Sequence, residues 1–266
     1  MFIISLTNSV TSIACALALT TLRVCDAVGR VIQTLPKGEP VCGVTSLDNQ
    51  LYVLRENKSS EQIEVYDIDS EYRLLRALTI PGLGERCDIV VCRHNLCAYI
   101  SDTSHDSVHK VSLSDATATH WLVKNEPAGL SLTYTHGVLV TCDKVRKIKE
   151  YSTDGQLLHE LTLPQDVVSP WHAVQLSSGQ FIVCHGRASD PLPRVCLIGS
   201  DGSVVKSFGG PKAWGIQQMR SPRHMAVDRN EFVFVLDANR QVLLLSPQLT
   251  YVRKVLPHKK TQVLSK

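Results

Sequence analysis

The chain has 266 residues, of which 44% are hydrophobic and 20% charged, so it carries enough apolar residues for the core of a folded domain. A formal net charge of +3 excludes a surface that is basic throughout, so any basic binding face must come from local clustering. The nine cysteines are an odd number, and those in apolar segments favour reduced, buried thiols and a cytoplasmic protein over a disulfide framework.

The first 22 residues carry no charge and include an apolar run at 13–19. No basic residue precedes this run, as a signal peptide requires, and the polar residues at 7–12 interrupt a membrane span. We therefore expect the inner strands of a degenerate first blade and no membrane contact. A signal peptide at residues 1–20, which would make the protein secreted, and a membrane anchor are the alternatives.

From residue 41 onward one pattern recurs five times. It consists of an apolar strand, a turn, a second apolar strand that ends near an acid, a polar loop and two further strands, most clearly in 222–245 and 170–198. Four-stranded repeats of this length predict a β-propeller. Alignment of the copies on their first strands makes five residues equivalent, at intervals of 45, 42, 43 and 52 residues: Cys42, Cys87, Gly129, His172 and His224.

Residues 22–36 match the outer half of a blade, which brings the expected number of blades to six. The fold predicted is all-β, a six-bladed propeller of four-stranded antiparallel blades with a degenerate first blade, forming one monomeric domain over 1–266. The expected blades are 1–40, 41–85, 86–127, 128–169, 170–221 and 222–266. Asp48-Asn49 and Asp154-Gly155 are among the pairs that supply the positive φ of tight hairpin turns. Ring closure would pair 261–265 with 2–6.

One repeat carries a family resemblance. Gly209-Gly210, the Pro at 222, the segment Ala226-Val227-Asp228 and the segment 235–242 (Val-Leu-Asp-Ala-Asn-Arg-Gln-Val) resemble an NHL repeat. The resemblance implies propellers like those at the end of tripartite-motif ubiquitin ligases, which bind protein or RNA. It also implies kinship with an amidating lyase that uses a channel zinc. Nothing in the sequence resembles a RING finger or B-box, so a ligase role would require another polypeptide.

The aligned strand starts are expected to surround the channel mouth. There, Cys42, Cys87, His172 and His224 form a set of ligands that suits zinc. The alternative is that they are structural residues that hydrogen-bond their neighbours at the start of a strand.

A second ring is expected at the ends of the second strands: Glu56, Asp102, Asp143, His185 and Asp237. Carboxylates there could bind calcium or act as acid and base. The alternative is that each acid hydrogen-bonds the backbone of its own loop.

Loops on the same face carry charges of both signs, which suit a protein or peptide better than a phosphate backbone. Trp214, flanked by Lys212 and Arg220, is the first candidate for a contact residue because it lies in a long loop. Trp121 and Trp171 lie in strand patterns and are expected in the core. The other candidate binding residues are Arg55, Arg187, Lys144, Arg146 and Arg240, with Lys58 nearby.

These patterns predict a non-catalytic scaffold that recognises a protein or peptide on the channel-mouth face, as the substrate-recognition part of a ubiquitin-ligase-type assembly. No cofactor is required by this prediction. One alternative is a lyase or hydrolase dependent on zinc or calcium that uses His172, His224 and His185. The other is binding of single-stranded RNA through Lys144 and Arg146.

Overall fold

The computed structural model describes residues 3–6, 12–18, 21–26, 29–36, 38–56, 61–84, 88–190, 193–210, 219–238 and 241–255. The strands of the first two sheets are β1 (Ile3–Leu6), β2 (Ser12–Ala18), β3 (Thr21–Asp26), β4 (Val31–Thr34), β5 (Val41–Leu47), β6 (Gln50–Arg55), β7 (Glu61–Asp67) and β8 (Arg73–Ile80). Those of the next two are β9 (Ile89–Cys92), β10 (Cys97–Asp102), β11 (Ser107–Ser112), β12 (Ala118–Leu122), β13 (Pro127–Leu132), β14 (Val138–Cys142), β15 (Lys147–Tyr151) and β16 (Leu157–Thr162). Those of the last two are β17 (Pro170–Gln175), β18 (Phe181–His185), β19 (Arg194–Ile198), β20 (Val204–Gly209), β21 (Pro222–Val227), β22 (Val233–Asp237), β23 (Gln241–Leu245) and β24 (Tyr251–Val255).

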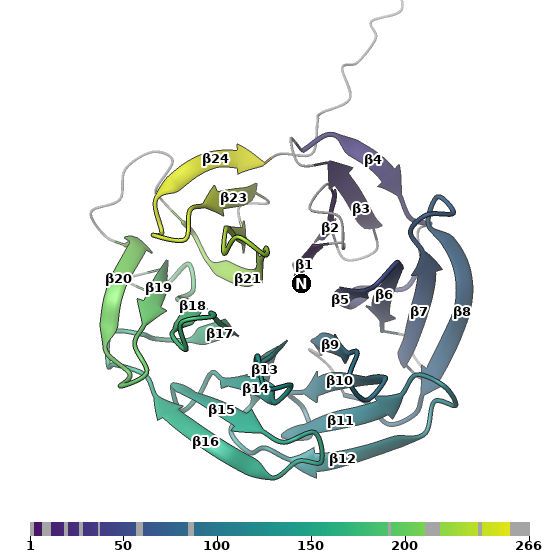
Figure 1. The fold of residues 1–266 in the computed structure, drawn as a ribbon, viewed down its shortest axis with the longest axis horizontal. Coiled ribbons are helices and arrows are strands. Elements are labelled where there is room, and N and C mark those ends of the chain that lie inside the picture. The colour runs from purple at the N-terminus through teal and green to yellow at the C-terminus, as the bar shows by residue number, and fades with distance from the viewer. Residues whose placement is uncertain are drawn as a thin grey trace, which may run out of the picture.

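The described residues form six four-stranded sheets, each made of four strands that are consecutive in the chain. Neighbouring strands within each sheet are antiparallel. The sheets stand around one axis with their first strands innermost and their fourth strands at the rim, as Figure 1 shows. The predicted all-β propeller is therefore confirmed. Within the described residues there is no helix with the length and apolarity that a membrane crossing needs.

Five blades, from β5–β8 to β21–β24, follow the pattern that recurs in the sequence. The remaining sheet, β1–β4, also has all four strands paired, so the expectation of a degenerate first blade is wrong. Its inner strand β1 contacts β5 on one side and β21 on the other, which places this sheet between the two ends of the five-blade series. The expected pairing of 261–265 with 2–6 lies outside the described residues.

The burial of each strand follows its distance from the axis. The second strands β10, β14, β18 and β22 are buried along their whole length. The outer strands β12 and β16 are largely exposed. The apolar core lies between adjacent sheets. One cluster, for example, joins Leu54 and Ile63 of the second sheet to Ile100 and Val111 of the third. Continuous apolar runs therefore mark second strands because both of their faces are covered.

Tight turns connect the strands at the positions that the sequence predicts. Asp48 has φ of 52° and Gly155 has φ of 85°, a backbone conformation that Gly and Asp adopt at low cost. The Gly155 N–H donates to Ser152 O at 3.0 Å, which closes the turn between β15 and β16. Cysteines lie inside the sheets, and six of those that the structure describes are free and buried: Cys42, Cys92, Cys97, Cys142, Cys184 and Cys196.

Candidate functional site

The inner strands of the last two blades begin with the same irregularity. The register of β17 shifts after Pro170, so Trp171 is the extra residue of a β-bulge and His172 resumes the pairing with β18. In β21 the extra residue is Arg223, and His224 resumes the pairing with β22. The bulge thus places an aromatic or cationic residue next to a histidine at the start of each inner strand.

The other blades show which residues share the position of these histidines. His172 lies opposite the penultimate residue of the second strand, and so does Gly43, because the register of β5 shifts around Cys42. In the third blade the penultimate residue is Ser101, whose N–H donates to Asp88 O at 3.0 Å. Asp88 and Gly43 therefore take the position of His172 in their own blades.

This register corrects the predicted metal ligands. Cys42 is not level with His172 and His224 but one residue away, and Cys87 lies outside the described residues. A bulge adds one residue without a clear sequence signal, and a slip of one residue turns a side chain to the opposite face. The Cys42 Sγ atom lies 3.8 Å from Glu56 Oε2, and burial followed by the charge of Glu56 raises the pKa of this thiol to about 12.

Asp88 is a buried carboxylate that the backbone holds in place. Its Oδ1 accepts a hydrogen bond from the N–H of Ile89 at 2.9 Å, and its Oδ2 accepts one from the N–H of Leu130, also at 2.9 Å. The Asp88 N–H donates to Ser101 Oγ at 2.9 Å. Because Leu130 belongs to the next blade, this carboxylate connects two sheets at the wall of the channel.

His172 and His224 stack on each other beside this carboxylate, with ring centroids 4.0 Å apart and an interplanar angle of 27°. His224 Nε2 is 3.3 Å from Asp88 Oδ1, and His172 Nε2 is 4.0 Å from Asp88 Oδ2. Burial works to raise the pKa of Asp88, but His224, His172 and a backbone N–H outweigh it and lower the pKa. Burial, followed by the charge of His224, lowers the pKa of His172 to about 3, so its ring is neutral.

The hydrogen bonding of the two rings is incomplete. His172 Nε2 lies 2.9 Å from the carbonyl oxygen of Leu130, which assigns the proton of the neutral ring to Nε2. Among the described residues, His172 Nδ1 and both ring nitrogens of His224 are buried and have no hydrogen-bond partner. Buried polar atoms without partners are uncommon and often mark a position where another group binds.

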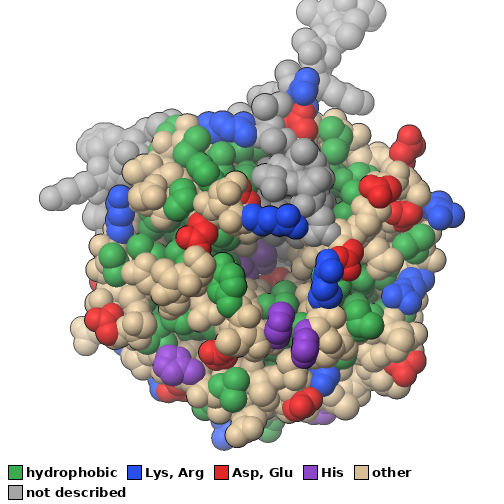
Figure 2. Space-filling view, viewed as in Figure 1, with side chains coloured by type: hydrophobic (Ala, Val, Ile, Leu, Met, Phe, Trp, Pro, Cys, Tyr) green, Lys and Arg blue, Asp and Glu red, His purple; other side chains and the backbone are tan. Residues whose placement is uncertain are grey.

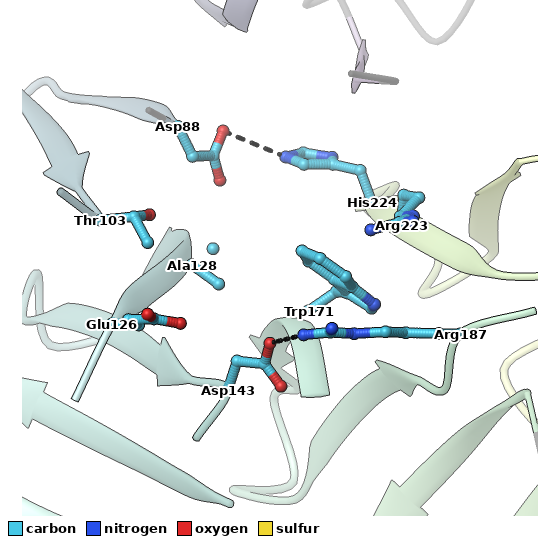
Figure 3. Close-up of a pocket in the computed structure, with 10 residues that line it drawn as sticks. Asp88, Thr103, Glu126, Ala128, Asp143, Trp171, Arg187, Arg223 and His224 are labelled. Carbon is cyan, nitrogen blue, oxygen red and sulfur yellow. Dashed lines mark hydrogen bonds and ion pairs between the residues drawn. The ribbon is translucent and has the colours of Figure 1, made fainter. Parts of the chain in front are cut away.

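The stack borders a cavity of about 420 Å³ at the start of the inner strands. Its lining comes from the strand starts and from the loops that follow the second strands, so these segments meet at one mouth, as expected. The lining residues are Asp88, Thr103, Glu126, Ala128, Gly129, Asp143, Trp171, Arg187, Arg223 and His224. Figure 3 shows Asp88 directed toward His224 on one side of the cavity, with Arg187 and Asp143 facing each other on another.

Trp171 is the centre of a group of cations in this cavity. The guanidinium carbon of Arg223 lies 4.0 Å from the centroid of the Trp171 ring, and that of Arg187 lies 5.3 Å from it. Arg187 also forms an ion pair with Asp143 at 2.5 Å. The buried indole N–H of Trp171 has no partner among the described residues. The cavity therefore offers donors on one wall and, at Asp143 and Glu126, acceptors on the other.

The structure separates the predicted binding residues. Arg187 lines the cavity, and Arg220 is exposed beside the start of β21. Arg55 is only 4% exposed and bonds Glu64 at 2.5 Å and Glu39 O at 2.9 Å, so it stabilises the second blade instead of contacting a partner.

Lys144 is exposed and forms an ion pair with Glu126 at 2.5 Å. Arg146 is half-buried in the turn before β15, where its φ is 51°. The remaining candidates, Trp214, Lys212, Arg240 and Lys58, lie outside the described residues.

The second ring is mostly structural. Asp237 accepts hydrogen bonds from the N–H groups of Arg220 at 3.0 Å and Ser221 at 2.7 Å. Asp102 accepts from the N–H of Gly84 at 2.9 Å and of His105 at 3.0 Å. Both acids therefore hold backbone, as the structural alternative expects. Only the contact of Asp102 with His105 lies in the acid's own loop, whereas Gly84, Arg220 and Ser221 precede the inner strand of the same blade. Asp143 instead reaches the cavity.

His185 points into its own sheet. Its Nδ1 lies 3.2 Å from Val168 O, and its Nε2 accepts a hydrogen bond from Arg194 Nε at 3.1 Å. The ring therefore lies apart from the Asp88, His172 and His224 cluster that the structure brings together. This arrangement does not support the use of His185 beside His172 and His224 in a shared site.

Sequence reasoning missed Asp88, Trp171, Arg223, Glu126 and Thr103. Trp171 was expected in the core; it packs on the core of the last two blades, but it also lines the cavity. One signal in the sequence was available for Trp171 and Arg223. Both are the middle residue of a repeated Pro-x-His segment, at 170–172 and at 222–224. Asp88 has no such signal, because its role depends on the strand pairing that puts it at the same position in its blade as His172 has in the fifth.

No protein-family model and no curated protein matches the sequence. Solved structures resemble the fold. A streptogramin B lyase has a TM-score of 0.67 at 14% identity, with 97% of this chain and 83% of that chain covered. The hydrazine synthase of Kuenenia stuttgartiensis has a TM-score of 0.68 at 11% identity, with 96% and 86% covered. The WD40 propeller domain of Doa1 has a TM-score of 0.64 at 12% identity, with 91% and 77% covered. At these identities the likeness shows the fold alone, which is that of β-propeller proteins.

Proposed function

We propose that the protein is a non-catalytic recognition module that binds a protein or peptide segment in the channel-mouth cavity. The observation that carries this proposal is the group around Trp171, where Arg187 and Arg223 contact the ring and Asp143 and Glu126 lie close by. Aromatic and arginine side chains are enriched among residues that dominate binding energy. Groups of both signs around one ring suit a segment that carries a carboxylate and a cationic or amide donor.

The distribution of charge supports a protein ligand over a nucleic acid. Lys144 is paired with Glu126, and Arg187 is paired with Asp143, so acids accompany the cations at the mouth. Figure 2 shows Lys and Arg side chains interspersed with Asp and Glu over the face in view, without a continuous track of one sign. A phosphate backbone requires a predominantly positive track.

The wider role follows from the NHL-like residues at 209–242. On this proposal the propeller is the substrate-recognition part of a ubiquitin-ligase-type assembly whose catalytic parts belong to another polypeptide. Six free, buried cysteines, such as Cys142, Cys184 and Cys196, support a reducing compartment, as expected for a cytoplasmic protein.

Screening the purified full chain against a display library of short peptides tests the proposal. Binding of the selected peptides would be measured by fluorescence anisotropy. Trp171→Ala and Arg187→Ala are expected to weaken binding by about tenfold or more, as for residues at the centre of an interface. The matched control is Arg76→Ala on the exposed strand β8, which should leave affinity unchanged.

Two results would reject the proposal. One is a library that yields no binder whose affinity depends on Trp171. The other is single-stranded RNA that binds at low salt and is weakened by Lys144→Ala or Arg146→Ala, because this would indicate contact with a phosphate backbone instead.

A further inference from the structure

Asp88, His172 and His224 come from three different blades, yet they offer three ligand atoms that all lie within 4.8 Å of one another. All three residues are buried. Two imidazoles and one carboxylate are a donor set that Zn²⁺ and the other divalent first-row transition metals favour, whereas Ca²⁺ and Mg²⁺ favour oxygen ligands. We propose that this cluster binds a divalent transition-metal ion of the zinc class. The inference does not rest on the proposed recognition of a peptide.

The separation of Asp88 and His224 fits two ligands of one ion better than it fits a hydrogen bond. Their atoms Oδ1 and Nε2 are 3.3 Å apart, but Nε2 has no hydrogen-bond partner among the described residues. Ligand atoms of a tetrahedral Zn²⁺ ion at about 2.0–2.1 Å from the metal lie roughly 3.3–3.4 Å from each other. An ion between these two atoms would therefore give the orphaned nitrogen a partner with little movement of the side chains.

His172 would ligate the ion through Nδ1, because its Nε2 is held by a backbone carbonyl. One ring nitrogen lies 2.9 Å from the carbonyl oxygen of Leu130, and its Nδ1 has no partner. In metal sites the second nitrogen of a ligating histidine commonly donates to a backbone carbonyl, which fixes the tautomer and the orientation of the ring. Asp88 is fixed in the same way, by the N–H groups of Ile89 and Leu130.

The charge of the cluster also calls for a cation. Asp88 is only 1% exposed, and besides two backbone N–H groups it faces the imidazole rings of His224 and His172. A buried carboxylate is costly unless it is paired or coordinates a metal. Asp88 and His224 also line the cavity, so an ion held there would be reached from the channel mouth.

The test uses the full chain after treatment with EDTA and removal of the chelator. Titration with Zn²⁺, followed by calorimetry and by elemental analysis of the dialysed protein, should show about one bound ion per chain. Co²⁺ as a substitute should give the intense visible absorption of a four-coordinate ion. Asp88→Asn keeps the shape of the side chain and should weaken Zn²⁺ binding at least tenfold, as should His172→Ala/His224→Ala.

An exposed histidine pair provides the control for adventitious binding. The His94 and His136 rings stack with centroids 4.9 Å apart on the surface, and His94→Ala/His136→Ala should leave the affinity unchanged. The proposal is overturned if the wild-type chain retains no Zn²⁺, or if the ion is lost only in the His94 and His136 variant. Because the wild-type stoichiometry and Co²⁺ spectrum involve no substitution, they decide the question even if the cluster variants do not fold.

Discussion

Asp237 is a buried carboxylate at the end of β22 whose role is to organise the backbone before β21. It is 0% exposed and accepts hydrogen bonds from the N–H groups of Arg220 and Ser221. Asp237→Ala leaves donors in the interior without partners, which costs about 1–3 kcal/mol for a buried group. We expect the free energy of unfolding in urea to fall by about 2–3 kcal/mol.

Asp201 provides the matched control for this prediction. It also accepts a hydrogen bond from a backbone N–H, that of Ser203 at 3.0 Å, but it is exposed, so water can replace it. Asp201→Ala should change the free energy of unfolding by less than about 0.5 kcal/mol. Equal effects of the two substitutions would show that burial does not set the cost.

His185 makes the stability depend on pH. Burial, followed by the charge of Arg194, lowers its pKa to about 4, against an ordinary value of about 6.5 in the unfolded chain. Between these values the unfolded chain binds a proton that the folded chain does not, so the free energy of unfolding falls as the pH is lowered from about 6.5 toward 4. The loss attributable to this residue is up to about 3 kcal/mol.

Urea unfolding of the metal-free protein at a series of pH values checks this dependence. His185→Gln should make the slope between about pH 4 and 6.5 less steep, whatever its effect on stability at pH 7. The slope that remains is expected from His172, whose pKa is also low. His159→Gln, on the exposed strand β16, should keep the slope of the wild type. A slope that His185→Gln leaves unchanged would assign the acid sensitivity to other groups.

At the scale of elements, the close approach of β13 and β17 depends on the absence of a side chain at Gly129. A Cβ atom there would lie 2.4 Å from the carbonyl oxygen of Trp171 and 2.9 Å from the Cα of His172. These are backbone atoms, so the two inner strands would have to separate. Gly129→Ala should therefore reduce the free energy of unfolding by about 1–3 kcal/mol, the usual cost of overpacking.

Gly38 is the control at this scale. Its added Cβ would meet only the Arg55 side chain, at 3.5 Å, an ordinary van der Waals contact. Gly38→Ala should stay within about 0.5 kcal/mol of the wild type in the same urea experiment. If Gly129→Ala is also neutral, the inner strands are not packed as closely as the structure indicates.

The identity of most strands could be read from the sequence, because apolar runs mark second strands and positive-φ residues mark the turns between them. The register could not. Cys42 was aligned with His172, although the pairing puts Gly43 there, because the shift in β5 has no local signature. Register is a property of two strands together, so a single strand cannot reveal it.

At the scale of the whole molecule, the first sheet contributes to the stability of the ring. Leu22 of β3 is 0% exposed and belongs to a core cluster with Val44 and Leu51 of the second blade. Leu22→Ala should lower the free energy of unfolding by about 2–5 kcal/mol, as in other buried cores. We also expect the variant to unfold in one transition, because the two sheets share a core.

Ile32 on the outer strand β4 of the same sheet provides the comparison. It is 55% exposed, so Ile32→Ala should have an effect below about 0.5 kcal/mol. Circular dichroism during urea unfolding measures both variants. If Leu22→Ala is as mild as Ile32→Ala, the first sheet is an appendage and not part of the cooperative ring.

The sequence by itself determined the propeller architecture, because a four-strand pattern that recurs at one period has to bury its apolar faces against neighbouring copies. It also pointed to His172 and His224, since alignment of the repeats on their first strands makes these residues equivalent. Only the tertiary structure placed Asp88 beside them and Trp171 in the cavity. Those neighbours come from separate blades, and the radial arrangement and the bulges, which involve several strands at once, decide which side chains meet at the channel.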